Sequence, residues 1–92
     1  MARFTVIWPK DVDDAYVDLW LRSDSPRREV LTQAAHLIQI WLGNIPANIG
    51  RPVGSAPGMR GWVLPLDTHV SVLYHVNEPD RLVTILQLIV KW

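Results

Sequence analysis

The chain has 92 residues, with nine basic residues balanced by nine acidic ones and no cysteine. This length predicts one domain, residues 1–92, with a hydrophobic core large enough to fold without cross-links. The absence of cysteine excludes a disulfide framework and a thiolate metal site. The zero net charge argues against a dedicated nucleic-acid binder, which usually has a basic excess for phosphate contacts.

No apolar run approaches the about 20 residues that a membrane-spanning helix needs. The N-terminal run "FTVIW" is too short for the apolar core of a signal peptide, and Pro9 and Lys10 end it. We therefore expect a cytoplasmic protein with no membrane partner.

The first two predicted elements are a strand and a helix. Arg3–Trp8 is rich in β-branched and aromatic residues, which predicts a strand that Pro9 ends. Asp11 is a favourable N-cap for a helix that should fray near Arg22. Apolar side chains recur within it at helical spacing: Val12, Ala15, Tyr16, Leu19 and Trp20.

A second helix has clearer start and stop signals. Ser25 can cap its N-terminus, Pro26 fits the first helical position, and Gly43 suits a left-handed C-terminal position. Its apolar stripe comprises Val30, Ala34, Leu37, Ile38 and Trp41. Because neighbouring positions widen the stripe, we expect this helix to lie on a sheet or against the first helix.

The second half of the chain predicts a loop followed by three strands. Residues 44–58 contain three prolines and three glycines, which argue against regular structure. The strands are predicted at Met59–Leu66, Thr68–Val76 and Arg81–Lys91, and "NEPD" forms a tight turn between the last two. The last strand is almost continuously apolar, which is typical of a strand covered on both faces.

The predicted order is therefore β-α-α-β-β-β. Helices and strands that do not alternate indicate the α+β class, with the helix hairpin packed on one face of an antiparallel sheet. The opposite face would remain partly open, and we expect Arg60 and His69 to project from it.

The polar side chains on this half of the chain allow several interpretations. His69, Ser71 and His75 share one strand face, but the two histidines lie about 20 Å apart and cannot hold one metal ion or phosphate on a straight strand. We expect neither a metal site nor a cofactor. Arg60 could contact phosphate or form a structural salt bridge, and both alternatives remain open.

The five tryptophans divide into two groups. Trp8, Trp20 and Trp41 fall on the apolar stripes and should belong to the core. Trp62 and Trp92 lie on strands whose neighbours leave them uncovered, so we expect them to contact a protein partner or a second copy of the chain.

Four segments together resemble the RelE/ParE superfamily of bacterial toxins from toxin–antitoxin systems. They are "FTVIW" with a helix ending in "DLWL", "AAHLIQIWLGNIPANIGRPV", "GMRGWVLPL" and "VSVLYHVNEPDRLVTIL". Their order and spacing extend the resemblance over nearly the whole chain. It implies a small cytoplasmic toxin that an antitoxin neutralises by wrapping it with helices or a strand.

The resemblance implies two activities: ribosome-dependent cleavage of messenger RNA, or inhibition of DNA gyrase. For cleavage, Arg60 matches the arginine that neutralises phosphate, with His69 and Lys91 as candidates for proton transfer or charge stabilisation. Target contacts would come from Arg51, Arg60 and Arg81. Two positions depart from the nuclease pattern, because Ser71 replaces an arginine and Trp92 a tyrosine. The rival interpretation is a degenerate, non-catalytic protein-binding module.

Overall fold

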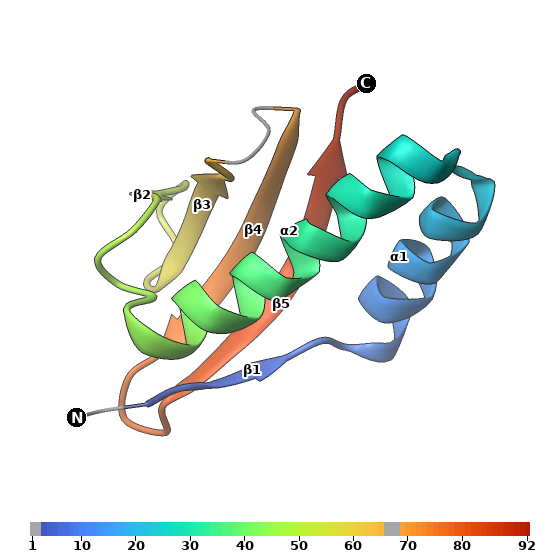
Figure 1. The fold of residues 1–92 in the computed structure, drawn as a ribbon. Helices are drawn as coiled ribbons and strands as arrows, with labels where there is room; N and C mark the ends of the chain where they lie inside the picture. Colours follow the sequence, from blue (N-terminus) through green and yellow to red (C-terminus); the bar gives the residue numbers. More distant parts are fainter. Residues whose placement is uncertain (1–2, 66–68) are drawn as a thin grey trace.

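The computed structural model describes residues 3–65 and 69–92. One short strand and two helices precede the other strands. The elements are β1 (Thr5–Ile7), α1 (Lys10–Arg22), α2 (Ser25–Asn44), β2 (Arg51–Pro52), β3 (Met59–Val63), β4 (Val70–Asn77) and β5 (Leu82–Val90). Both helices lie on the same side of the sheet, so the predicted α+β arrangement is confirmed (Figure 1). The predicted strand ends at Leu66 and Thr68 fall outside the described residues.

The sheet has the strand order β1-β5-β4-β3-β2, and it is mixed rather than wholly antiparallel. The strands β3 to β5 form the predicted antiparallel meander, and β2, which was not predicted, adds a further antiparallel strand beside β3. The prediction was wrong for β1, which pairs in parallel with the start of β5 from Thr5 opposite Leu82. Tight turns fix the direction of consecutive strands, whereas β1 reaches its partner only after the whole helix hairpin has intervened.

Both helices begin earlier than predicted. Helix α1 starts at Lys10 after Pro9, and no side chain caps it, so Asp11 lies in the first turn instead. In α2 the cap is Asp24 rather than Ser25, and its carboxylate accepts a hydrogen bond from the amide of Arg27 at 3.1 Å. A carboxylate at this position satisfies an unpaired backbone donor and faces the positive end of the helix.

Gly43 lies inside α2 and does not terminate it as predicted, because the helix continues to Asn44. The carbonyl of Gly43 accepts a hydrogen bond of 2.9 Å from the amide of Phe4. A β-carbon at Gly43 would lie 3.6 Å from the Phe4 carbonyl oxygen. This is an ordinary van der Waals distance, so the contact of the N-terminal segment with the last turn of α2 does not require a glycine.

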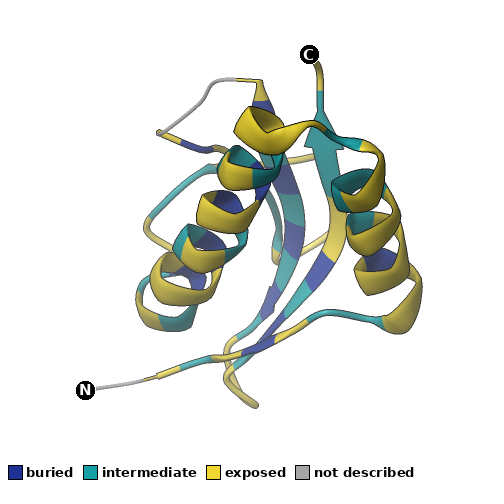
Figure 2. Cartoon of the chain, turned by 45° about the vertical axis from the view of Figure 1, so that its right-hand side comes forward, coloured by how far each residue is buried: buried dark blue, intermediate teal, exposed yellow. Residues whose placement is uncertain are grey.

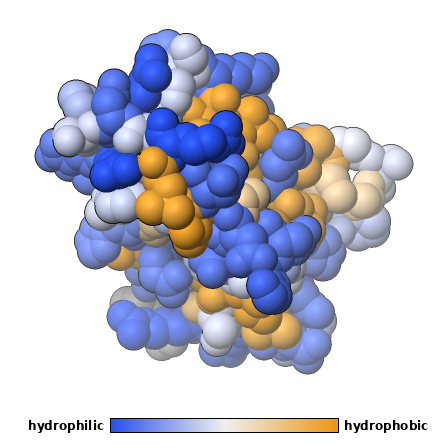
Figure 3. All heavy atoms as spheres, turned by 90° about the vertical axis from the view of Figure 1, so that its right-hand side faces the viewer, coloured by the Kyte–Doolittle hydropathy of each residue, from blue (hydrophilic) through white to orange (hydrophobic). Residues whose placement is uncertain are grey.

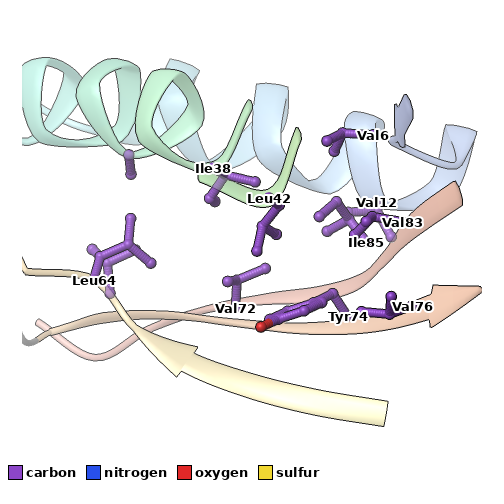
Figure 4. Packing of buried hydrophobic residues seen from close by; sticks show 12 residues of the cluster. Val6, Val12, Ile38, Leu42, Leu64, Val72, Tyr74, Val76, Val83 and Ile85 are labelled. Atoms are coloured by element: carbon purple, nitrogen blue, oxygen red, sulfur yellow. The ribbon is translucent and has the colours of Figure 1, made fainter. Parts of the chain in front are cut away.

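The hydrophobic core fills the space between the helix pair and the covered face of the sheet (Figure 4). Every second residue of β4 is buried, as its alternating sequence predicts. The buried cluster joins α2 to β4 and β5 through Ala34, Ile38, Leu42, Val70, Val72, Tyr74, Val76, Val83 and Ile85. The outer sides of both helices are exposed, as Figure 2 shows in yellow.

Strand β5 is buried only in its first half, contrary to the prediction that both of its faces are covered. Val83 and Ile85 are buried, whereas Leu86 and Gln87 are exposed. The register with β4 shifts at Leu73 and Tyr74, which makes Leu86 an extra residue in the ladder. Because β1 pairs only as far as Thr84, the outer edge of β5 beyond that residue has no partner strand within the described residues.

The loop between α2 and β3 is mostly irregular, as predicted, and includes the two-residue strand β2. Gly50, Gly54 and Gly58 all have positive φ angles, a conformation that side chains disfavour. A β-carbon at Gly50 would meet the Gly61 carbonyl oxygen at 2.4 Å, so only glycine fits at this crossing. No helix in the described ranges is long and apolar enough to cross a membrane.

Candidate functional site

Arg60 lies on the helix-covered side of the sheet, and not on the open face as predicted. In the register of β3 with β4 it stands opposite Tyr74, whose side chain is fully buried. Its guanidinium donates from Nε to the carbonyl of Ile49 and from Nη2 to that of Gly50, both at 3.1 Å. Arg60 therefore holds the loop that follows α2, and within the described residues it forms no salt bridge.

Tyr74 fastens the same loop from inside the core. Its hydroxyl lies 3.0 Å from the carbonyl oxygen of Pro46 and 2.9 Å from that of Ile49, so its single proton is shared between them. Burial raises the pKa of Tyr74 above its usual value of 10.0, and the hydrogen bond and charge of Arg60 oppose that rise. The phenol thus remains a protonated donor at neutral pH.

His69 and Lys91 lie together at the other end of the sheet. The amide of Lys91 donates to the carbonyl of His69 at 2.9 Å, which continues the β4–β5 ladder by one pair. Both residues are exposed. The position opposite Arg60 is five residues away from His69 along β4, a separation of about 17 Å. The three candidate catalytic residues are therefore not brought into one site.

The other predicted cations are also dispersed. Arg51 is exposed on the edge strand β2 opposite Gly61, a residue of the open face. Arg81 is exposed in the turn before β5 and adopts a positive φ of 52°. Arg51, Arg60 and Arg81 therefore do not form one continuous basic patch.

A shallow hollow of about 460 Å³ lies beside Arg60, between the loop after α2 and the β4–β5 turn. Its lining includes His75, Asn77 and Glu78, together with Gly58. The sequence interpretation ranked His75 below His69. The sequence did contain a sign that His75 lies near Arg60. An antiparallel pairing of the two predicted strands places His75 beside the start of the strand that contains Arg60, and residues of neighbouring strands come close together.

The two tryptophans predicted to contact a partner have different environments. Trp62 is half-buried and packs against Trp41 of α2, with ring centroids 6.5 Å apart. Trp41, predicted to be core, is 42% exposed. Trp92 is 38% exposed, and the guanidinium carbon of Arg27 lies 5.5 Å from its ring centroid. Much of the aromatic surface at both positions is thus covered by contacts within the chain.

The surface between α1 and the free edge of β5 forms an apolar groove, which we call the α1–β5 groove. It has a volume of about 270 Å³. Its lining is Asp11, Val12, Ala15, Tyr16, Leu19, Leu86, Gln87 and Leu88. Apolar side chains reach the surface on this side of the molecule, as Figure 3 shows in orange.

One carboxylate, that of Asp11, lines the α1–β5 groove, whereas Asp13 lines a hollow on the other side of α1 with Trp8 and Ala35. Lys10 pairs with Asp14 at 2.8 Å and Arg22 with Asp18 at 3.0 Å along α1. Asp11 and Asp13 are exposed and form no ion pair within the described residues. The described residues contain no cluster of histidine and carboxylate side chains suited to a metal ion.

No protein-family model and no curated protein sequence matches this chain. Solved structures do match. A chain of the RelBE2 toxin–antitoxin complex from Mycobacterium tuberculosis has a TM-score of 0.72 at 17% identity, covering 98% of this chain and 100% of that one. A chain of the chromosomal ParDE toxin–antitoxin system of P. aeruginosa has a TM-score of 0.66 at 17% identity, with 98% of both chains covered.

The isolated RelE toxin of E. coli matches with a TM-score of 0.58 at 15% identity, over 99% of this chain and 86% of that chain. These agreements extend along almost the entire sequence and include the helix hairpin and the sheet. The fold of this protein is therefore that of the RelE/ParE-like toxins.

Proposed function

We propose that this protein is the toxin of a toxin–antitoxin pair and arrests growth in the cytoplasm when its antitoxin is absent. The observation behind this proposal is the agreement in fold with RelE and with chains of two toxin–antitoxin systems over at least 98% of the chain. The resemblance of the four sequence segments to the RelE/ParE superfamily points to the same function.

We infer that the antitoxin docks at the α1–β5 groove. The free edge of β5 offers unpaired backbone donors and acceptors to an extended segment. Val12, Leu19 and Leu86 would receive its apolar side chains. The carboxylate of Asp11 favours a lysine or arginine at the end of that segment. The proposed partner is therefore an antitoxin segment that combines alternating apolar residues with a basic residue.

The toxin would act by binding its target rather than by cutting RNA. Cleavage needs a proton acceptor, a proton donor and a cation around one phosphate. Arg60 is about 17 Å along the sheet from His69 and Lys91, and its guanidinium is bonded to loop carbonyls. This separation favours inhibition by contact with DNA gyrase or the ribosome.

Cleavage of messenger RNA is the second candidate, and one observation favours it. His75 and the partly exposed Arg60 line the same hollow, so an imidazole and a guanidinium are available on one concave surface. Histidine is able to transfer protons near neutral pH. In this alternative His75 would take the role that the sequence suggested for His69.

Induced expression in a bacterial host tests these alternatives. Growth arrest that a co-expressed antitoxin relieves would support the toxin role, and an unaffected culture would indicate an inert binding module. Transcript ends should remain intact while DNA-damage signalling rises if gyrase is the target. New transcript ends that disappear in His75→Ala and Arg60→Ala, but persist in Arg51→Ala, would establish cleavage instead.

A further inference from the structure

A second hollow lies on the other side of α1 from the α1–β5 groove, and we call it the Trp8–Asp13 hollow. It has a volume of about 360 Å³ and is lined by Trp8, Asp13, Tyr16 and Ala35. Asp13 and Tyr16 are three residues apart on α1 and therefore share one side of that helix. The amide of Asp13 donates to the carbonyl of Pro9 at 2.9 Å, which places the first turn of α1 directly after Trp8. The hollow thus combines two aromatic rings with one carboxylate.

The aromatic wall of the hollow is held in place by contacts within the chain. The Tyr16 hydroxyl donates to the carbonyl of Leu31 on α2 at 2.9 Å. The Tyr16 ring meets the ring of Trp8 edge-on, with centroids 6.0 Å apart and 61° between the planes. Trp8 packs against the core and is still partly exposed. Because both rings are already ordered, a bound group would cost little further side-chain entropy.

The carboxylate of the hollow has no partner within the described residues. Asp13 is exposed, and its side chain forms neither an ion pair nor a hydrogen bond there. Lys10, the basic residue nearest to it along α1, is bound to Asp14 at 2.8 Å. Two basic and four acidic residues give α1 a net charge of −2. The charge around the hollow is therefore negative and favours a cation from outside the chain.

The second helix also supplies no cation to this hollow. Its lining residue on α2 is Ala35, whose side chain is a single methyl group. The neighbouring His36 is exposed and does not line the hollow. Arg28 is seven residues from Ala35, about 10 Å along the helix, and its guanidinium is bonded to the carbonyls at the end of α1. The space beside the two rings is thus left open.

We propose that the Trp8–Asp13 hollow receives an arginine side chain of the antitoxin, an inference that rests on the proposed toxin function. A guanidinium is attracted to the face of an indole ring, and its planar N–H donors match the two oxygens of a carboxylate. Lysine would use the same carboxylate but would stack less favourably on the ring. Trp8 and Asp13 together therefore favour arginine.

Continuity with the α1–β5 groove identifies the antitoxin as the source of this arginine. Tyr16 lines both the groove and the hollow, and Asp11 of the groove belongs to the same first turn as Asp13. A helix is about 10 Å across, a distance that an extended chain covers in about three residues. The arginine would follow the segment in the groove at about that spacing. The antitoxin would then hold the first turn of α1 from both sides.

Titration with a blocked arginine, N-acetyl-arginine methylamide, tests the hollow without the antitoxin. The indole N–H resonance of Trp8 in the NMR spectrum of the purified chain should shift, and blocked citrulline, which has a similar shape without the charge, should shift it far less. Asp13→Asn should weaken arginine binding at least about threefold. Asp18→Asn is the matched control, because it removes the same charge from an exposed position of the same helix and should leave binding unchanged. Equal shifts with both ligands, or equal effects of both variants, would overturn the proposal.

Neutralisation in cells tests whether the arginine comes from the antitoxin. Asp13→Asn should still arrest growth, but the co-expressed antitoxin should relieve that arrest less well than it does for Asp18→Asn. Equal relief of both variants would overturn the assignment to the antitoxin. Because the titration uses no antitoxin and growth arrest needs no bound arginine, failure of this inference can be distinguished from failure of the toxin function.

Discussion

Arg60 and Tyr74 fix the same short piece of backbone, the turn that leads from α2 toward β2. Their side chains supply four contacts to the carbonyls of Pro46, Ile49 and Gly50. Pro46 is itself fully buried. Since an irregular segment cannot satisfy its own carbonyls, buried side-chain donors take the place of a regular hydrogen-bond ladder. Arg60 is thus primarily a loop anchor in this structure.

Replacing Arg60 by alanine should therefore destabilise the protein. Two charge-assisted hydrogen bonds would be lost, at a cost of about 2–3 kcal/mol in the free energy of unfolding. Urea denaturation measures this change. Arg51→Ala is the control, and as an exposed substitution it should change the free energy by less than about 0.5 kcal/mol. An Arg60→Ala protein with unchanged stability but no growth arrest would instead assign Arg60 to target contact.

Tyr74 should make stability dependent on pH in the alkaline range. Burial raises its folded-state pKa above 10.0, so the folded protein holds the phenolic proton more tightly than the unfolded chain. The stabilisation is present in full below pH 10.0 and is lost as pH rises through the higher folded-state value. Urea denaturation on both sides of that pH should show this decline, and Tyr74→Phe should reduce it.

Tyr16→Phe is the comparison for this experiment, because burial also raises the pKa of Tyr16. In the Tyr16→Phe variant, the loss of folding stability at alkaline pH that is due to Tyr74 should remain. The same loss of stability above pH 10.0 in Tyr74→Phe as in the unaltered protein would contradict the assignment.

The face of Arg60 shows what sequence could predict at the residue scale. A strand near Met59 was predicted correctly, but side-chain direction depends on parity, and a shift of one residue reverses every side chain. In "MRGWVL" both alternating sets of residues, the odd-numbered and the even-numbered, contain apolar side chains. The sequence therefore did not show which set faces the core. The informative pair was Trp62 and Leu64, which share the parity of Arg60, and Leu64 is fully buried.

At the scale of elements, Arg28 joins the two helices at the closed end of the hairpin, in addition to the hydrogen bonds from Tyr16 to Leu31 and from Trp20 to Thr32. Arg28 of α2 donates from Nε to the carbonyl of Trp20 and from Nη2 to that of Leu21, both at 2.9 Å. Its guanidinium carbon also lies 4.4 Å from the ring centroid of Trp20. Arg28 therefore satisfies the last carbonyls of α1 and complements the negative end of that helix.

Arg28→Ala should consequently loosen the hairpin, whereas its neighbour Arg27 should matter little. The loss of two hydrogen bonds and a cation–π contact should lower the free energy of unfolding by about 2 kcal/mol. Arg27→Ala should cost less than about 1 kcal/mol, because among the described residues the Arg27 guanidinium contacts the Trp92 ring, and both residues are exposed. Thermal or urea denaturation of the two variants would test this, and equal losses would argue against the capping role of Arg28.

The order of the elements could be predicted because proline, glycine and the spacing of apolar residues are local sequence signals. These signals located the ends of both helices and of the last three strands to within a few residues. The parallel pairing of β1 with β5 could not be predicted in this way, since it joins segments more than seventy residues apart. The free edge of β5 was missed for the same reason, because it exists only where β1 stops pairing.

The whole molecule divides its surface into parts with different chemistry. The helix pair covers one face of the sheet (Figure 1), and the open face has Arg51 on its edge strand, level with Leu73. The α1–β5 groove is apolar with Asp11 at one end, and the arginines are scattered over the loop, the edge strand and the turn. A single domain of this size can therefore offer separate surfaces to the proposed antitoxin and to the proposed target.

Leu86 provides the decisive test of the antitoxin surface, because it is 37% exposed at the bulge and lines the α1–β5 groove. Leu86→Arg adds a charge to an apolar contact and repels a basic partner, so it should weaken antitoxin binding at least about tenfold. An exposed position predicts little change in folding or in growth arrest. The variant should thus arrest growth even when the antitoxin is co-expressed.

Val63→Arg is the matched control for this substitution. Val63 is 56% exposed on β3, away from the α1–β5 groove, so the antitoxin should still neutralise that variant. Binding of both purified variants to the antitoxin by calorimetry would separate loss of affinity from loss of toxicity. If the antitoxin bound Leu86→Arg as tightly as the unaltered toxin, the docking surface would have to lie elsewhere, although the toxin function itself could still hold.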